Sequence, residues 1–156
     1  MSDNPLQRFW VAARAAVPRL PEERPEAWAF GASSDPAQAD RLLTLVLDGV
    51  KTATSSSAWD YEAAQEPLPE PGDFSIICDS TGRPRAVIET TAVEVTPFNE
   101  VDAAHAAAEG EGDRTLAYWR REHERFWRAH SENDRGFAAD MPVVCERFVV
   151  VFALRP

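Results

Sequence analysis

The sequence predicts a folded α+β domain, and size, composition and residue patterning each support this. The chain has 156 residues, which is within the usual size of one domain. Its composition is 44% hydrophobic and 10% aromatic, which is too apolar for a disordered chain. Helical and strand-like patterns both occur along it, separated by proline- and glycine-rich turns. We therefore expect helices packed on a sheet around one hydrophobic core.

The first predicted element is an N-terminal helix over residues 5–17. Its apolar side chains recur at helical spacing. They are Leu6, Phe9, Trp10, Ala13 and Val17. The following PRLPEERPE run contains three prolines and predicts an irregular connection. Residues 1–27 are thus expected to form a helix and a proline-rich connection to the main domain.

A second helix is expected to begin after Asp35. Asp35 can cap it and Pro36 can open it, because proline is tolerated in the first helical turn. One face of the helix is apolar, with Ala39, Leu42, Leu43 and Val46. Gly49 is placed to end it, so Lys51 follows a helix C-terminus directly.

Three apolar runs predict strands. Residues 73–79 and 85–95 flank the turn STGRP and are expected to form an antiparallel pair. Residues 141–154 carry the longest strand signal. The threonine- and serine-rich run at 51–56 is compatible with a short strand or with a turn into one.

Two further helices are predicted between these strands. Residues 101–113 form a short alanine-rich helix broken by glycines, and a longer helix runs from about Asp113 to His130, with Asp113 as a candidate cap. One side of the longer helix gathers Leu116, Trp119, His123, Phe126, Trp127 and His130. The opposite stripe gathers Arg114, Arg121, Arg125 and Arg128. A solvated face is the ordinary interpretation of that stripe, and a phosphate-contacting surface is the alternative.

Charge and cysteine usage narrow the function classes. The formal net charge of -10 disfavours nonspecific binding to long nucleic acid. Cys78 and Cys145 each lie in an apolar run, which predicts buried free thiols in a reducing compartment and argues against metal binding by them. No run approaches the roughly 18 apolar residues of a membrane span, and the N-terminus lacks a signal-peptide pattern. A cytoplasmic protein without a membrane partner is expected.

Lys51 is the first candidate for chemistry, because it is the only lysine among 16 basic residues. Unlike arginine, lysine can lose its proton near neutral pH when it is buried. No P-loop, GxGxxG, GxSxG or zinc-ligand pattern occurs in the sequence. The remaining candidates are the hydroxyls that follow Lys51 and the acidic run EGEGD, with Glu109 and Glu111. That run is equally compatible with a helix stop and with a functional loop.

Several segments together resemble the ASCH domain family, in its longer branch. They are GVKTATS, PLPEPGDFSIICD, AVIETTAVEVTPF, AAAEGEGDRTLAYWRREHERFW and VVCERFVVVF. The most specific match is the G-x-K-x-x-T pattern of Gly49, Lys51 and Thr54, together with EGEGD. The resemblance covers about residues 28–154, so we expect an ASCH domain over residues 28–156.

The resemblance implies a PUA-like fold, a small mixed β-barrel surrounded by helices. It also implies an RNA- or nucleoside-directed hydrolase, most plainly an amidohydrolase acting on an N4-acylated cytidine-like pyrimidine. A ribonuclease acting on single-stranded RNA and a noncatalytic RNA-binding module are the alternatives. No cofactor is implied, except a divalent metal ion for a ribonuclease. The expected partner is a modified nucleoside or RNA, and the sequence makes no prediction of oligomeric state.

The resemblance also implies the working residues. Lys51 and Thr54 match the lysine and threonine of the amidohydrolase motif, with Thr54 as nucleophile and Lys51 as base or charge stabiliser. The matching glutamate is either Glu109, counted from the histidine of HAAAE, or Glu111, counted back from DRTL.

Six residues are candidate substrate contacts: Ser55, Ser56, Trp59, Tyr61, Arg120 and His123. Trp59 and Tyr61 could stack on a base, although aromatic side chains more often pack the core. His123 lies in an aromatic helix face, where a hydrogen-bonded core histidine is the favoured alternative to a ligand contact.

Overall fold

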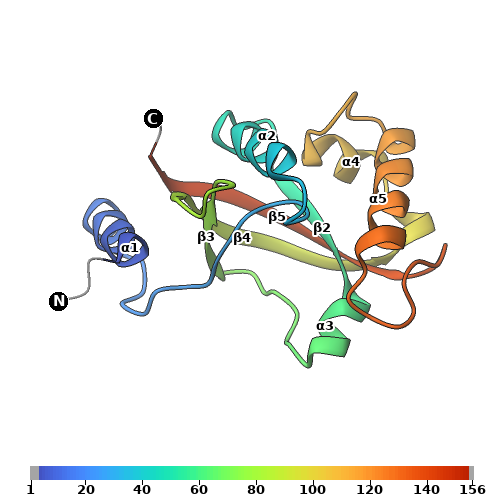
Figure 1. The fold of residues 1–156 in the computed structure, drawn as a ribbon, viewed down its shortest axis with the longest axis horizontal. Helices are drawn as coiled ribbons and strands as arrows, with labels where there is room; N and C mark the ends of the chain where they lie inside the picture. The colour runs from blue at the N-terminus through green and yellow to red at the C-terminus, as the bar shows by residue number, and fades with distance from the viewer. Residues whose placement is uncertain (1–3, 155–156) are drawn as a thin grey trace. The chain divides into compact units, whose positions relative to one another are not determined.

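The computed structural model describes residues 4–154, which form five α-helices, one 3-10 helix and five strands (Figure 1). The chain contains two compact units. The first unit holds α1 (Pro5–Ala16), β1 (Ala27–Trp28), α2 (Pro36–Leu47) and β3 (Phe74–Cys78). The second holds β2 (Ala53–Ser57), α3 (Ala58–Ala64), η1 (Phe98–Glu100), α4 (Ala103–Glu109) and α5 (Leu116–His130). The strands β4 (Pro84–Pro97) and β5 (Pro142–Ala153) each contribute residues to both units.

The strands form one mixed sheet in the order β1-β3-β4-β5-β2. β3 and β4 pair antiparallel, with Ile76 opposite Val87, as the sequence predicts. β2 pairs antiparallel with β5, and β1 pairs parallel with β3. The α+β class is therefore confirmed, and the strand pairings of residues 4–154 do not close the sheet into a complete barrel. The short elements β1 and α3 were not predicted.

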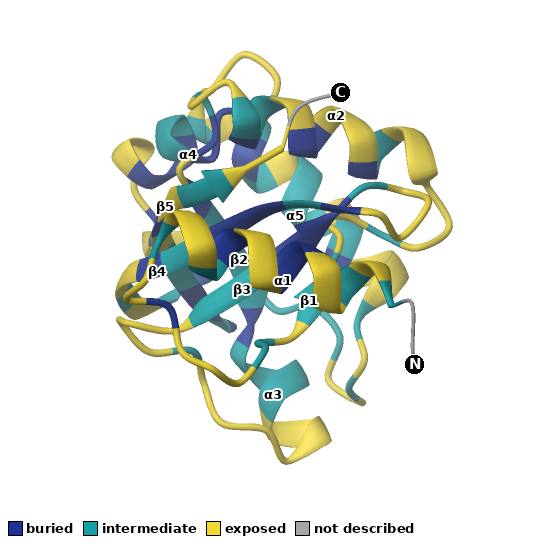
Figure 2. Cartoon of the chain, turned by 90° about the vertical axis from the view of Figure 1, so that its left-hand side faces the viewer, coloured by how far each residue is buried: buried dark blue, intermediate teal, exposed yellow. Residues whose placement is uncertain are grey.

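The two helices of the first unit begin as their sequences predict. Asn4 caps α1 by accepting a hydrogen bond from Leu6 N, and Asp35 caps α2 by accepting one from Gln38 N. α1 buries Phe9, Trp10 and Ala13 in a core cluster, while much of its opposite side is exposed (Figure 2).

In the second unit, the cap of α5 differs from the prediction. Thr115, not Asp113, is the N-cap, and its hydroxyl accepts a hydrogen bond from Tyr118 N. Asp113 instead accepts from the backbone and hydroxyl of Thr115, so it orients the capping residue. The prediction that Arg114 belongs to the arginine stripe of this helix is wrong, because Arg114 precedes α5 and has a φ of 64°.

The core of the second unit is strongly aromatic. Phe98, Trp119 and Trp127 pack together with ring centroids 5.3–6.3 Å apart. On the predicted apolar face of α5, Trp119 and Trp127 are therefore the buried residues. α4 contacts both α5 and β2, so the helix that carries Glu109 packs between this core and the strand that follows Lys51.

Candidate functional site

The backbone around Lys51 is fixed to the C-terminal end of α4. Thr52 N donates to Ala108 O at 2.8 Å, and Thr52 O accepts from Phe148 N at 3.1 Å. Gly110 ends α4 with a φ of 73°, and a Cβ there would lie 2.6 Å from Val50 O. Glycine is therefore required at position 110 both for its backbone conformation and for the close approach of the lysine segment.

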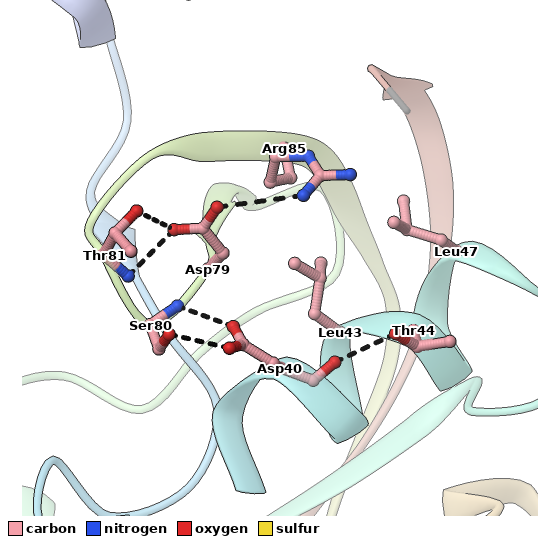
Figure 3. Close-up of a pocket in the computed structure, with 8 residues that line it drawn as sticks. All are labelled: Asp40, Leu43, Thr44, Leu47, Asp79, Ser80, Thr81 and Arg85. Atoms are coloured by element: carbon pink, nitrogen blue, oxygen red, sulfur yellow. Dashed lines mark hydrogen bonds and ion pairs between the residues drawn. The ribbon is translucent and has the colours of Figure 1, made fainter. Parts of the chain in front are cut away.

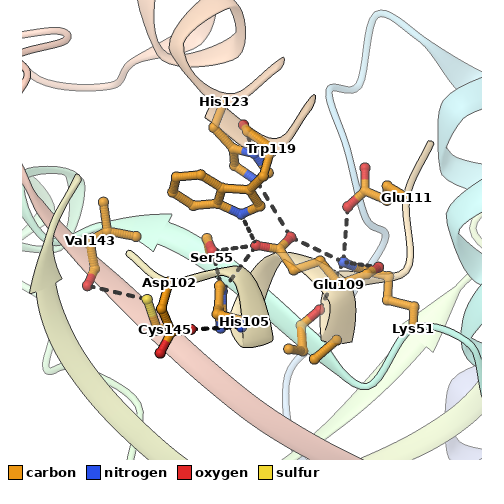
Figure 4. A network of polar contacts seen from close by, with 12 residues as sticks. Lys51, Ser55, Asp102, His105, Glu109, Glu111, Trp119, His123, Val143 and Cys145 are labelled. Atoms are coloured by element: carbon orange, nitrogen blue, oxygen red, sulfur yellow. Dashed lines mark hydrogen bonds and ion pairs between the residues drawn. The ribbon is translucent and has the colours of Figure 1, made fainter. Parts of the chain in front are cut away.

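Lys51 is almost completely buried, and acceptors surround its ammonium group (Figure 4). Nζ donates to Ala53 O at 2.9 Å and to Glu111 Oε2 at 3.1 Å. Glu109 Oε1 lies 3.4 Å away. The side chain is 1% exposed, so the protein itself supplies the partners that water would otherwise supply.

Glu109 is the centre of the contacts drawn in Figure 4. Its Oε2 accepts from the indole Nε1 of Trp119, from Ser55 Oγ, and from His105 Nε2 at 3.0 Å. Its Oε1 lies 3.4 Å from His123 Nε2 as well as 3.4 Å from Lys51 Nζ. We call Lys51, Glu109, Glu111 and the groups that contact Glu109 the Lys51 network: Lys51, Ser55, His105, Glu109, Glu111, Trp119 and His123.

The charges in this network shift two pKa values. Burial alone would raise the pKa of Glu109, but the charges of His123 and Lys51 and the hydrogen bonds from His105 and His123 hold it well below its usual range. Burial would lower the pKa of His123, but the charge and hydrogen bond of Glu109 raise it. His123 also donates from Nδ1 to Trp119 O at 2.8 Å. Glu109 is therefore an ionised acceptor and a weak base.

The remaining network carboxylate is more accessible. Glu111 is 22% exposed and contacts Lys51. The sequence left Glu109 and Glu111 as alternatives, and both contact the ammonium group of Lys51. Glu109 does so as a buried side chain, and Glu111 as a partly exposed one.

The hydroxyls after Lys51 lie on two different faces of β2. Ser55 contacts both His105 and Glu109. Successive side chains of a strand point to opposite faces, so Thr54 lies on the face opposite to Ser55. Among the hydrogen bonds described for residues 4–154, Thr54 takes part in none of those around Glu109. Thr54 is instead paired in register with Glu146 of β5.

The face that carries Thr54 also contains Ser56, another predicted site residue. We call Thr54, Ser56, Val144 and Glu146 the Thr54 face, because register and alternation place them together. Ser56 Oγ lies 3.4 Å from the hydroxyl of Tyr61.

The two other candidate substrate contacts have partners within the protein. Trp59 packs on the aromatic core, and the guanidinium of Arg135 lies 5.1 Å from its ring. Arg120 donates from Nη2 to the carbonyls of Asn99 and Val101. Both contacts favour structural roles for these side chains.

Sequence reasoning missed His105, Trp119 and Glu146. His105 and Glu109 are spaced i,i+4 on a predicted helix, which is a signal that could have linked them. Glu146 and its neighbour Arg147 were visible as two charged residues inside a mostly apolar strand.

Two arginines of the predicted stripe on α5 are paired with glutamates of the same helix. Arg125 lies 2.8 Å from Glu122, and Arg128 lies 2.9 Å from Glu124. These pairs favour a solvated face over a phosphate-contacting surface.

The two cysteines are free thiols. Cys78 is buried as predicted, whereas Cys145 is only partly buried, and burial raises the pKa of its thiol to about 12. Within residues 4–154, no cluster of His, Cys, Asp and Glu side chains is arranged to hold a metal ion. No helix in the same range is long and apolar enough to cross a membrane.

A separate pocket of about 330 Å³ lies in the first unit. Asp40 accepts from Ser80, and Asp79 accepts from Thr81 and lies 3.8 Å from Arg85 (Figure 3). None of the predicted site residues lines it.

Comparison with known families decides the classification. The ASCH domain family profile matches residues 26–152. The chain belongs to the ASCH domain family. The resemblance seen in the sequence is thereby confirmed.

Solved structures agree with the ASCH assignment. Protein EF3133 from Enterococcus faecalis V583, described as a member of the DUF984 family, is 37% identical with a TM-score of 0.85, over 94% of this chain and 87% of that one. An ASCH domain from Lactobacillus crispatus JV V101 is 30% identical with a TM-score of 0.82, over 94% of each chain. Hypothetical protein PH0355 is 13% identical with a TM-score of 0.54, over 80% of this chain and 97% of that one, and shares the fold alone. No curated protein matches the ASCH chain.

Proposed function

We propose that this ASCH protein is a hydrolase of modified pyrimidine nucleosides, with amidohydrolase-type chemistry on an N4-acylated cytidine. The observation that carries the proposal is the burial of Lys51, the lysine of the G-x-K-x-x-T motif, between Glu109 and Glu111. Removing such charges from water is costly, and buried groups with a shifted pKa, as Glu109 has, concentrate at functional sites. The net charge of -10 also favours a neutral nucleoside over a long polyanion as the substrate.

In the proposed reaction, Thr54 is the nucleophile. Its hydroxyl attacks the acyl carbon, the bond from that carbon to N4 breaks, and the amine leaves with a proton. Water then hydrolyses the acyl-threonine ester, which releases the carboxylic acid and restores the hydroxyl. Lys51 and Glu109 act as positioning residues, because Nζ bonds Ala53 O at the start of the strand that carries Thr54.

The test is an assay of the purified protein against N4-acetylcytidine and against labelled single-stranded RNA, with and without a divalent metal ion. Acetate release with intact RNA is the expected result. RNA cleavage without acetate release would identify a ribonuclease instead. RNA retention without turnover would identify a binding module, whose affinity should fall steeply with salt concentration.

Thr54→Ala is the decisive variant. Ser55→Ala is the comparison, because Ser55 is adjacent in sequence but lies on the other face of β2. Thr54→Ala should abolish acetate release, and wild-type protein quenched during turnover should carry one acetyl group by mass spectrometry. Ser55→Ala removes a hydrogen bond to Glu109 and should lower stability more than it lowers turnover per folded molecule. The opposite ranking would assign the nucleophile to Ser55.

A further inference from the structure

The proposed nucleophile needs a group that takes its proton, because a threonine hydroxyl by itself is a poor nucleophile. Lys51 is badly placed for this task. Its ammonium group already donates to Ala53 O, Glu109 and Glu111, and its side chain is 1% exposed. Nζ is therefore enclosed by acceptors of the protein and is directed at them rather than at Thr54.

Glu109 is excluded by its own contacts. Its two oxygens already accept from the indole of Trp119 and the hydroxyl of Ser55 and contact the rings of His105 and His123. A carboxylate with so many donors holds an added proton weakly. It also contacts Ser55, which lies on the face of β2 opposite to Thr54.

Glu146 is placed differently. The antiparallel register sets it directly opposite Thr54, and directly opposed residues have Cβ atoms about 4.5–5.5 Å apart. Both residues are half-buried, so neither side chain is closed off from solvent. Glu146 Oε1 also accepts from Thr90 Oγ1 at 3.3 Å, and Thr90 is buried. The Thr90 hydroxyl therefore helps to orient the carboxylate beside Thr54.

We propose that Glu146 is a further catalytic residue, the carboxylate that takes the proton from Thr54. The Thr54 proton moves to Glu146 as the Oγ1 lone pair forms the bond to the acyl carbon. Glu146 then returns this proton to N4 as the bond from carbon to nitrogen breaks. In the second half-reaction, Glu146 takes a proton from the attacking water and returns it to the Thr54 oxygen. This inference rests on the proposed function.

The first test is Glu146→Gln, which keeps the shape of the side chain and an oxygen that Thr90 can contact. General-base catalysis contributes about 100-fold to 10,000-fold, so kcat on N4-acetylcytidine should fall by about 100-fold or more. KM should change little. The wild type should lose kcat/KM at low pH as the carboxylate of Glu146 is protonated, and this fall should disappear in the variant. Glu124→Gln, at an exposed position on α5, is the matched control and should behave as wild type.

The second test is Thr90→Val, which removes the hydroxyl bound to Glu146 and preserves the side-chain shape. Loss of a donor to the ionised carboxylate raises the pKa of that carboxylate. The low-pH limb of kcat/KM should therefore move to higher pH, a change that a general loss of stability would not produce. This variant keeps the inference testable if Glu146→Gln does not fold.

The outcomes separate the two proposals. A wild-type protein that does not release acetate overturns the proposed function and this inference with it. An active wild type whose low-pH limb survives unchanged in Glu146→Gln or Thr90→Val overturns the role of Glu146 alone. A rapid-quench experiment that shows slower acetylation of Glu146→Gln, with Thr54→Ala showing none, supports both.

Discussion

The ammonium group of Lys51 lies 3.4 Å from Glu109 Oε1, and the two side chains are 1% and 2% exposed. A pair this deeply buried differs from the exposed pair of Arg128 and Glu124, which lie 2.9 Å apart with 61% and 44% exposure. Exposed pairs contribute about 0–1 kcal/mol, whereas removing one partner of a buried pair leaves a charge that neither water nor protein compensates fully. The single lysine of the chain is therefore coupled to the folding of the second unit.

The first prediction compares these two pairs. Lys51→Met should lower the free energy of unfolding by about 3–5 kcal/mol, because the carboxylate of Glu109 loses its buried cation. Arg128→Met should lower it by less than about 1 kcal/mol. Urea unfolding followed by tryptophan fluorescence measures both. Equal effects of the two substitutions would show that the buried pair has no special role in stability.

The second prediction concerns the identity of the cation. Lys51→Arg keeps the charge but places a larger, planar group in a filled site, so it should cost about 1–3 kcal/mol of stability. Acetate release should then be measured per folded molecule. The arginine side chain cannot serve as a base near neutral pH, so full turnover in this variant would exclude a base role for Lys51 and leave its positioning role intact.

The third prediction concerns Gly110. Gly110→Ala places an alanine at a φ of 73° and brings its Cβ within 2.6 Å of Val50 O, a backbone atom that cannot move independently. Gly136→Ala is the matched control, because Gly136 has a φ of 67° but open space around it. The control should cost about 1–2 kcal/mol for the left-handed conformation alone. Gly110→Ala should cost clearly more in urea unfolding, and equal losses would contradict the packing argument.

The fourth prediction concerns pH. The pKa of His123 is raised above its ordinary value of 6.5, mainly because the charge of Glu109 outweighs the effect of burial. Protonated His123 therefore stabilises the folded state fully below about pH 6.5, and this contribution is lost as the pH rises through the higher folded value. The melting temperature of the wild type should fall between pH 6 and pH 9 more than that of His123→Gln.

The control for this measurement is His130→Gln, because His130 is exposed at the C-terminal end of α5. It should keep the wild-type dependence of melting temperature on pH. If His123→Gln also kept that dependence, the protonated ring of His123 would not contribute to stability.

The sequence predicted the helices and long strands because their patterning is local. Asp35 with Pro36 marks the start of α2, and the two apolar runs around the STGRP turn predict the β3–β4 pair that forms. The N-cap of α5 was predicted wrongly, because Asp113 and Thr115 both have side chains that can cap a helix. Local sequence does not show which of the two accepts a hydrogen bond from a backbone N–H of the first helical turn.

The site was less predictable because its contacts are long-range. Lys51 and the two glutamates of EGEGD were recognised as candidates from the sequence, but only the fold shows that both glutamates contact the same ammonium group. The separation of Thr54 from Ser55 follows from strand alternation, which could not be applied while residues 51–56 remained either strand or turn. The pairing of Thr54 with Glu146 depends on a register between segments far apart in sequence.

The last prediction distinguishes the two aromatic side chains that follow the lysine motif. Trp59 packs on the core of the second unit, whereas the hydroxyl of Tyr61 lies beside Ser56, a residue of the Thr54 face. Trp59→Ala should therefore lower the melting temperature with little change in the affinity of folded protein for N4-acetylcytidine. Tyr61→Ala should weaken binding by roughly ten-fold to hundred-fold, because base stacking contributes about 1–3 kcal/mol. Isothermal titration of the Thr54→Ala background avoids turnover during the measurement. Unchanged affinity in Tyr61→Ala would remove this side chain from the binding surface, and weakened affinity in a normally melting Trp59→Ala would reverse the two assignments.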